Sequence, residues 1–309
     1  MGRISNIIPR IKERGGEMQK TAKARLMLTV SMFIFGTIGI FVRNIPLSSG
    51  AIALCRACLA ALLIGAVLII KRENPFKGVG KALPWLLLSG AAMGFNWILL
   101  FEAYKHTTVS VATLSYYFAP VIVILVCPLL FSEKMGIKQW ICFLASTAGI
   151  VLITGIGDLS KGRNHLLGIA FGLGAAALYA SVILLNKFIK TVEGLHRTFL
   201  QFLAAIGVLI PYVLLSGGIE FSALDGKGIT CLLIVGLLHT GITYCLYFSS
   251  LKELSGATAA VLSYIDPLVA VLSSVFILRE EMLSPAGMLG GALILGFTLW
   301  NEIPSRKKY

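Results

Sequence analysis

One short pattern occurs twice in this chain, and it constrains the possible folds more than any other feature. Each copy contains a tyrosine, a proline, a leucine and a glutamate at identical spacing: Tyr117, Pro120, Leu125 and Glu133, then Tyr264, Pro267, Leu272 and Glu280. The same offset of 147 residues relates Lys105 to Lys252, Ala112 to Ala259 and Gly149 to Gly296. Each copy lies in an apolar run, so the pattern predicts a duplicated membrane unit of about five helices. Because five is odd, the second unit must enter the membrane from the opposite side.

The composition agrees with a chain that lies mostly in lipid. Apolar residues make up 57% of it and charged residues 13%, which is about half the charged share of soluble proteins. Runs of roughly 20 apolar residues cross a bilayer, and we draw ten: 26–42, 49–70, 82–103, 108–130, 137–154, 167–186, 198–215, 229–250, 256–278 and 285–301. We therefore predict an all-α integral membrane protein with ten transmembrane helices, built as two inverted five-helix repeats (5+5). A basic tail over 1–24 precedes a first repeat over 25–157 and a second over 165–303.

Positive charge is distributed unevenly between the two predicted faces of the membrane. The two tails and the even-numbered loops hold 20 lysines and arginines, whereas the odd-numbered loops hold six. This bias places both termini in the cytoplasm of a cell-membrane protein. The net charge of +13 thus reports topology and contact with the lipid bilayer, and we expect no nucleic-acid partner. The polar N-terminal tail predicts a flexible or surface-lying segment rather than a cleavable signal.

Motifs of cofactor and metal chemistry are absent or out of context. Cys55 and Cys58 form a C-x-x-C within an apolar helix with no second pair, so we interpret them as packing residues. Gly172, Gly174 and Ala177 resemble a dinucleotide fingerprint, but no strand precedes them. We expect no cofactor and no metal. An integral-membrane enzyme would need clustered His, Asp or Cys at one interface, which the sequence does not show.

Three ionisable residues lie deep in the predicted helices, where charge costs at least ~2.5 kcal/mol on insertion scales. Arg56 lies about 10 Å below the outer face; it either extends to that surface or binds a carboxylate, from substrate or from a buried acid. His239 lies near the midplane as a hydrogen-bonded packing residue or a proton relay. Asp266 precedes Pro267, so it either caps a restarted helix or lines a cavity that binds an ammonium group or a proton.

Aromatic and amide side chains surround these charges in the sequence. Tyr117 and Tyr264 precede the repeated prolines by nearly one turn, which places them beside any midplane cavity. The residues that we expect to bind substrate are Asp266, Arg56, Tyr117, Tyr264, Asn96, Trp97, His239 and Tyr179. In contrast, Glu102, Glu133 and Glu280 lie at helix ends, and we interpret them as loop or cap carboxylates. Glycines four residues apart, such as Gly168 and Gly172, predict close helix packing.

The repeated tract, from Tyr117-Phe118-Ala119-Pro120 to Ser132-Glu133 and from Tyr264-Ile265-Asp266-Pro267 to Arg279-Glu280, resembles the EamA domain of the drug/metabolite transporter superfamily. Arg56 near the start of the second helix adds to the resemblance, which covers the chain after residue 24. The second copy has no clear equivalent of Arg56; Gln201 or Leu200 is nearest. The resemblance implies a carrier of small metabolites, often an exporter of amino acids, with a central cavity.

Inverted repeats are a construction principle of secondary transporters, which alternate access around a midplane site. We therefore expect an exporter or exchanger of small metabolites, with amino acids or related amphiphiles favoured and a monomer as a plausible state. The alternative is a lipid or lipid-linked sugar translocator of the same fold, which needs a lateral opening between helices.

Overall fold

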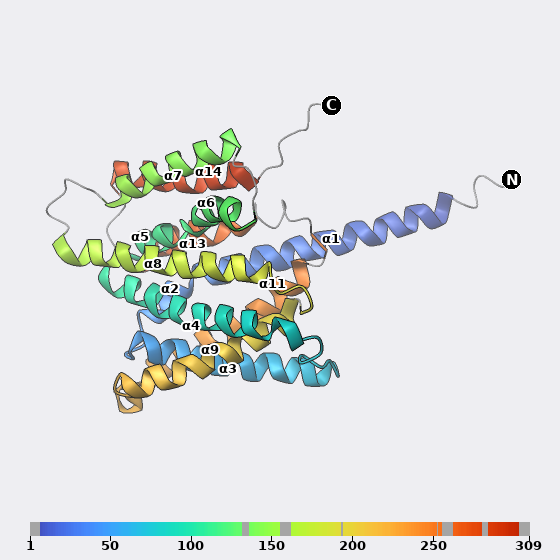
Figure 1. Ribbon diagram of the computed structural model, residues 1–309, viewed down its shortest axis with the longest axis horizontal. Helices are drawn as coiled ribbons and strands as arrows, with labels where there is room; N and C mark the ends of the chain where they lie inside the picture. Colours follow the sequence, from blue (N-terminus) through green and yellow to red (C-terminus); the bar gives the residue numbers. More distant parts are fainter. Residues whose placement is uncertain are drawn as a thin grey trace.

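The computed structural model describes residues 7–131, 136–154, 162–192, 194–251, 253–254, 262–279 and 284–302, and all regular structure in these residues is helical (Figure 1). The α-helices of the first half are α1 (Ile7–Gly36), α2 (Ile38–Val42), α3 (Ser49–Ile70), α4 (Leu83–His106), α5 (Val109–Tyr116), α6 (Ala119–Phe131) and α7 (Ile137–Thr154). Those of the second half are α8 (Gly162–Asn186), α9 (Gly194–Leu215), α10 (Gly226–Leu233), α11 (Thr243–Leu251), α13 (Ile265–Phe276) and α14 (Pro285–Glu302). A π-helix, η4 (Ile234–Ile242), joins α10 to α11, and short 3₁₀ turns are η1 (Gly80–Ala82) and η3 (Phe221–Ala223).

The chain is a multi-pass membrane protein. Six helical segments of the described part are long and apolar enough to cross a bilayer: Gln19–Val42, Ser49–Ile70, Gly80–His106, Asn164–Asn186, Gly194–Leu215 and Gly226–Leu251. Shorter apolar helices cover Val109–Val123, Trp140–Gly149, Ile265–Phe276 and Pro285–Phe297. These segments fall within or close to the ten runs drawn from the sequence.

Contacts between a helix of the first half and a helix of the second half are matched by contacts between their equivalents in the other half. Helix α4 packs on α9, as the η4 segment packs on α3; α8 packs on α4 and α5, as α1 packs on α11 and α13. Three contacts join equivalent helices, namely α3 with α9, α5 with α13, and α7 with α14. Figure 1 shows α7 and α14 side by side at one edge of the bundle and α3 and α9 at the opposite edge. The described structure therefore has the two-repeat layout that the sequence pattern indicates.

Two glycines make equivalent close contacts in the two repeats, Gly90 between α4 and α9 and Gly236 between η4 and α3. An ideal Cβ on Gly90 would lie 2.5 Å from both the Ala204 Cβ and the Gln201 carbonyl oxygen, and one on Gly236 would lie 2.4 Å from Leu59 Cδ1. The offset between the repeats is thus 146 residues for this glycine pair and 145 for Leu59 and Ala204. Close approach without a side chain at these positions lets the backbones of membrane helices pack tightly.

Both repeats interrupt a helix at the repeated tyrosine. The chain leaves helical geometry at Tyr117 and Phe118, between α5 and α6, and again at Tyr264 before α13. A third interruption separates α1 from α2 at Thr37. Pro120 and Pro267 have no N–H to donate to the carbonyl four residues earlier, that of Tyr116 or Ser263, which explains the first two breaks. The expected single run over 108–130 is therefore two helices.

The part of the basic N-terminal tail that the structure describes is helical, and its place relative to the membrane surface stays a prediction. Residues from Ile7 onward form one helix with the first apolar segment, and this helix projects beyond the bundle in Figure 1. The physical reason is composition, because Lys, Arg, Glu, Met and Ala between 10 and 27 are strong helix formers. The helix-end glutamates Glu133 and Glu280 lie outside the described residues.

Glycines on α8 fulfil the packing role expected of them. An ideal Cβ on Gly168 would lie 2.7 Å from Thr107 Cβ, and one on Gly172 would lie 2.8 Å from Ser115 Cβ. This close packing holds α8 against α5 along its length, from Thr107 to Ser115, and so keeps Tyr116 at the end of α5 next to Tyr179 of α8.

Candidate functional site

Asp266 occupies the first turn of α13, directly after the second helix break. The N-terminal boundary residue of α13 is Tyr264, so Asp266 is the second residue of the helix and is not the N-cap. The expectation that Asp266 caps the restarted helix is therefore wrong by two residues. The helix begins one residue before the Asp-Pro pair because Ile265 already has helical geometry. The Asp266 carboxylate is consequently not committed to the backbone N–H groups of its own helix.

The partner of this carboxylate comes from the first repeat. The Tyr117 hydroxyl lies 2.9 Å from Asp266 Oδ2, to which it donates, and 3.3 Å from the Ser263 carbonyl oxygen. Asp266 is partly exposed, whereas its counterpart in the first repeat, Ala119, is 1% exposed and packs against Ala176 and Ala180. The second repeat therefore has a carboxylate at the position where the first repeat has the buried methyl group of Ala119.

Tyrosine rings form a continuous cluster beside Asp266. The ring centroids of Tyr117 and Tyr264 are 6.4 Å apart, those of Tyr116 and Tyr117 are 6.2 Å apart, and those of Tyr116 and Tyr179 are 5.3 Å apart. All four side chains are partly exposed or exposed; Tyr179 reaches 38%. These rings come from α5, α8 and the break before α13, so the cluster lies where both repeats meet.

Asn96 supports this cluster from α4. It is 2% exposed, and its side-chain amide donates to the Ala175 carbonyl oxygen at 2.6 Å. The same side chain also interacts with the Tyr116 hydroxyl. Asn96 therefore joins α4 to α8 and holds Tyr116 in place. These contacts are those of a buried residue that supports the site.

Arg56 forms the second charged part of the site, on α3. The residue is 3% exposed, its guanidinium carbon lies 4.4 Å from the Trp97 ring centroid and 5.3 Å from that of Phe101, and its Nε donates to Thr240 Oγ1 at 3.0 Å. Extension to the membrane surface, one of the alternatives drawn from the sequence, is therefore wrong. Pairing with a buried acid is not seen either, because Arg56 forms no ion pair within the described residues.

Three tyrosines, Tyr104, Tyr116 and Tyr244, lie within electrostatic range of both Arg56 and Asp266. Arg56 and Asp266 themselves form no salt bridge in the part of the chain that the structure describes. A cation and an anion that are not paired with each other are both available to a ligand.

His239 lies next to Thr240 in the π-helix but faces another direction. Its Nε2 is 3.0 Å from the Thr37 hydroxyl oxygen at the break between α1 and α2, and its ring centroid lies 5.0 Å from that of Phe41. Its Nδ1 lies 3.3 Å from the Ile234 carbonyl oxygen. The hydrogen-bonded environment agrees with the packing alternative, and His239 belongs to the Arg56 side of the site.

The structure thus brings the expected residues into two adjoining groups. Asp266, Tyr117, Tyr264, Tyr179 and Asn96 form one, and Arg56 and Trp97, with His239 behind them, form the other. Four residues near these groups were not among those expected to bind substrate: Tyr104, Tyr116, Tyr244 and Thr240. Tyr116 and Tyr244 were visible as tyrosines in apolar helices, whereas nothing in the sequence marked Thr240.

The position equivalent to Arg56 in the second repeat is Gln201. Each is the eighth residue of its helix, counted from Ser49 in α3 and from Gly194 in α9. The Gln201 amide donates to Ser89 Oγ and to Asn186 Oδ1, both at 2.7 Å. The buried amide is satisfied by these neutral partners, so the repeats differ in charge at this position.

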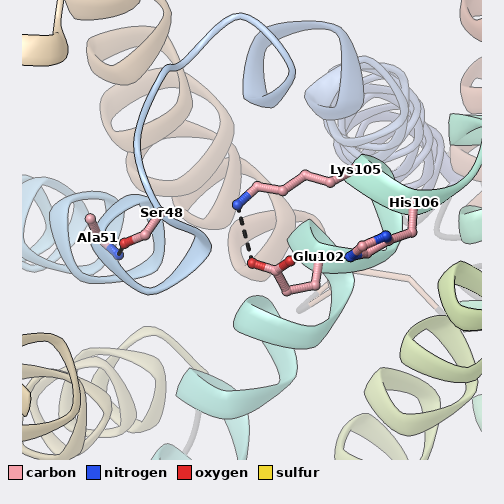
Figure 2. Close-up of polar contacts among 5 residues, drawn as sticks. All are labelled: Ser48, Ala51, Glu102, Lys105 and His106. Atoms are coloured by element: carbon pink, nitrogen blue, oxygen red, sulfur yellow. Dashed lines mark hydrogen bonds and ion pairs between the residues drawn. The ribbon is translucent and has the colours of Figure 1, made fainter. Parts of the chain in front are cut away.

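Other polar groups in the described residues have local roles. Figure 2 shows Glu102 near the end of α4, where it contacts Lys105 at 3.1 Å and His106 at 3.8 Å. In the same view the Ser48 hydroxyl accepts from the Ala51 N–H at the start of α3. Glu102 is therefore the helix-end carboxylate expected. No group of three potential metal ligands occurs in the described part of the chain, and Cys55 and Cys58 are free thiols.

Comparison with known proteins gives consistent matches along the chain. A model described as the EamA-like transporter family matches residues 22–155 and 166–301. An uncharacterized transporter of Bacillus subtilis (strain 168), YxxF, is 31% identical over 261 residues, which cover 84% of this chain and 83% of the relative. Protein PecM of Dickeya dadantii (strain 3937) is 27% identical over 78% of this chain and 80% of its own. A crystal structure with 14% identity superposes with a TM-score of 0.61 over 89% of this chain and 95% of the other, which supports the fold alone.

Proposed function

Because the chain belongs to the EamA-like transporter family, we propose that it is a secondary transporter, an exporter or exchanger of small metabolites. The favoured substrates are amino acids and related amphiphiles. One observation carries this choice: Arg56, which is buried, and Asp266, which is partly exposed, are opposite charges on different repeats and form no ion pair with each other in the described residues. An α-amino acid carries the complementary pair of charges.

The proposed topology has ten transmembrane helices in two inverted repeats, over 25–157 and 165–303, with both termini in the cytoplasm of a cell-membrane protein. The exchange of packing partners between the repeats supports it, since equivalent helices meet equivalent neighbours. The distribution of positive charge supports the orientation. Proteins built in this way alternate access by moving one part against another around a shared site.

In this proposal each group of the site has a separate role. The substrate ammonium binds near Asp266, whose carboxylate Tyr117 orients by its hydrogen bond. The substrate carboxylate binds Arg56, which lies against the Trp97 ring. Tyr264, Tyr179 and Asn96 shape the pocket, and His239 links the Arg56 side to the break in the first helix. The breaks at Thr37, Tyr117 and Tyr264 are the hinge positions.

Counterflow into liposomes tests the proposal. Purified protein is reconstituted into vesicles loaded with one unlabelled amino acid at a time, and uptake of the same labelled amino acid is measured with and without a pH gradient. We expect uptake of at least one amino acid above that of protein-free vesicles. No flux of any of the 20 standard amino acids under either condition would contradict the proposed substrate class.

A second candidate function, transport of a lipid or lipid-linked sugar, is favoured by one feature. A groove of 410 Å³ lies along α8, between α4 and α6, with leucine and valine side chains such as Leu88, Val126 and Leu178 in its wall. Its polar residue, Ser181, donates its hydroxyl to the Ala177 carbonyl at 2.9 Å. The groove therefore suits an alkyl chain, and α8 also carries Tyr179.

A substitution that fills the groove separates the two candidates. Ala92 lines the groove on α4, and Ala92→Trp would occupy much of its volume. If lipid transport is the function, this variant abolishes scrambling of a phospholipid labelled on its acyl chain. If the protein carries amino acids, Ala92→Trp retains counterflow, and neither the unmodified protein nor the variant scrambles lipid.

A further inference from the structure

The Thr240 hydroxyl binds the Nε edge of the Arg56 guanidinium and can do so only as a hydrogen-bond acceptor. Thr240 donates its only hydroxyl hydrogen to the Val235 carbonyl oxygen at 2.7 Å, so its oxygen can act only as an acceptor toward Arg56 Nε. Thr240 is fully buried, which removes water as a competing partner. The hydrogen-bond directions at this edge of Arg56 are therefore fixed.

The π-helix makes this arrangement possible. The side chains of His239 and Thr240 in η4, and of Thr243 directly after it, each contact the carbonyl oxygen five residues earlier, those of Ile234, Val235 and Leu238. A π-helical turn is rare and occurs most often at functional sites. Here the wider turn places the Thr240 hydroxyl between its own helix and α3, where Arg56 reaches it.

The rest of the guanidinium has aromatic neighbours but no hydrogen-bond acceptor among the described residues. The ring centroids of Trp97 and Phe101 lie 4.4 and 5.3 Å from the guanidinium carbon. Nε is the one donor of Arg56 with a partner, so the two terminal amino groups have none. Neither terminal nitrogen is among the buried atoms that lack a partner, so the small residual exposure of Arg56 includes this end of the group.

We propose that Thr240 is a positioning residue that aims the terminal fork of Arg56 at a carboxylate of the transported molecule. The proposal rests on the proposed function and names the group that this side of the site recognises. The guanidinium fork matches the two oxygens of a carboxylate through parallel hydrogen bonds, and lysine cannot reproduce this geometry. A site built for such a bond rejects an analogue that lacks the carboxylate, because the buried donors then stay unpaired.

Trp97 provides a direct binding signal because Arg56 lies against its ring. In full-length protein with Trp85, Trp140 and Trp300 replaced by Phe, fluorescence is titrated with L-leucine, with N-acetyl-L-leucine and with L-leucinamide. The second probe keeps the carboxylate and loses the ammonium, and the third does the reverse. We expect L-leucinamide to bind at least about 100-fold more weakly than L-leucine.

Variants of the π-helix then test the role of Thr240. Thr240→Val should weaken L-leucine binding about ten-fold and reduce its preference over L-leucinamide, whereas Thr240→Ser should keep both. Arg56→Lys should lose the preference as well. The matched control is Thr243→Val, because Thr243 is equally buried and makes the same backward bond, at 2.7 Å, without contacting Arg56. We expect this control to bind all three probes as the unmodified protein does.

The outcomes distinguish this proposal from the proposed function. Equal preference for L-leucine in Thr240→Val and Thr243→Val would overturn the positioning role, even if counterflow is normal. The absence of a Trp97 response to both carboxylate probes would overturn it too. Binding with the expected variant pattern, but without flux of any amino acid, would leave carboxylate recognition supported and contradict transport.

Discussion

The Tyr117 hydroxyl donates to the Asp266 carboxylate across the interface between the two repeats, at 2.9 Å. Both residues lie at helix breaks, and they are 149 positions apart in the chain. The bond joins a tyrosine that both repeats possess to an acid that only the second possesses. The repeated tyrosine thus has a carboxylate partner in only one of its two copies, and this asymmetry gives the site a single negative charge.

Removal of this hydroxyl should weaken substrate binding without unfolding the protein. We predict that Tyr117→Phe raises the half-saturating concentration for counterflow about ten-fold, since a hydrogen bond to a charged group is lost while the ring is kept. Tyr247→Phe is the control, because the Tyr247 hydroxyl makes no hydrogen bond within the described residues. Equal half-saturating concentrations for both variants would contradict a role for the Tyr117–Asp266 bond.

The repeated Tyr and Pro residues contained most of what the sequence could reveal about this part of the site. Proline restricts the residue before it, so a break beside Pro267 could be expected. The N-cap of α13 was predicted two residues late, at Asp266 instead of Tyr264, because Asp is a better N-cap than Tyr and local preference alone decided the prediction. Pairing of Tyr117 with Asp266 was not predictable, since it depends on how the repeats pack.

The Arg56 side shows a different limit. Hydrophobic pattern indicates that residues 229–250 form a helix, but it does not distinguish an α-helical turn from the wider π-helical turn that positions Thr240. The offset between repeats also falls from 147 residues at Tyr117 and Tyr264 to 145 at Arg56 and Gln201. A fixed offset of 147 would indicate Leu203, whereas the equal place of the two residues in their helices identifies Gln201.

Close approach of α1 to α13 should make Gly36 intolerant of substitution. An ideal Cβ at Gly36 would lie 2.5 Å from the Asp266 carbonyl oxygen and 2.7 Å from Val269 Cβ. We predict that Gly36→Ala costs roughly 1–3 kcal/mol through overpacking and reduces counterflow, as it displaces the start of α13. Gly207→Ala, with nothing within 4 Å of its ideal Cβ, should keep the melting temperature in detergent or raise it. A Gly36→Ala protein as stable and active as the Gly207→Ala protein would contradict this packing.

Inverted repeats should place equivalent loops on opposite sides of the membrane. Lys77 follows α3 and Ser222 follows α9, and both are exposed. In a variant with the six native cysteines replaced by Ala, we predict that a membrane-impermeant maleimide added to intact cells labels Ser222→Cys, whereas Lys77→Cys reacts only after permeabilisation. Labelling of both from the same side would contradict the antiparallel arrangement.

The ion pairs of Glu102 should matter little. Its contacts with Lys105 and His106 lie at the end of α4, and all three side chains are partly exposed to solvent (Figure 2). Such pairs contribute about 0–1 kcal/mol. We predict that Glu102→Gln melts in detergent within about 2 °C of the unmodified protein and retains counterflow. Loss of transport at normal stability would instead place Glu102 in the substrate path.

The most direct measurement compares two aspartates in the counterflow assay. Asp266→Asn keeps an oxygen that can accept from Tyr117 but removes the charge, and Asp225→Asn does the same at the N-cap of α10, where Asn caps equally well. We predict that Asp266→Asn abolishes flux at unchanged expression, while Asp225→Asn transports normally. Normal flux through Asp266→Asn would contradict binding of the transported molecule by this carboxylate.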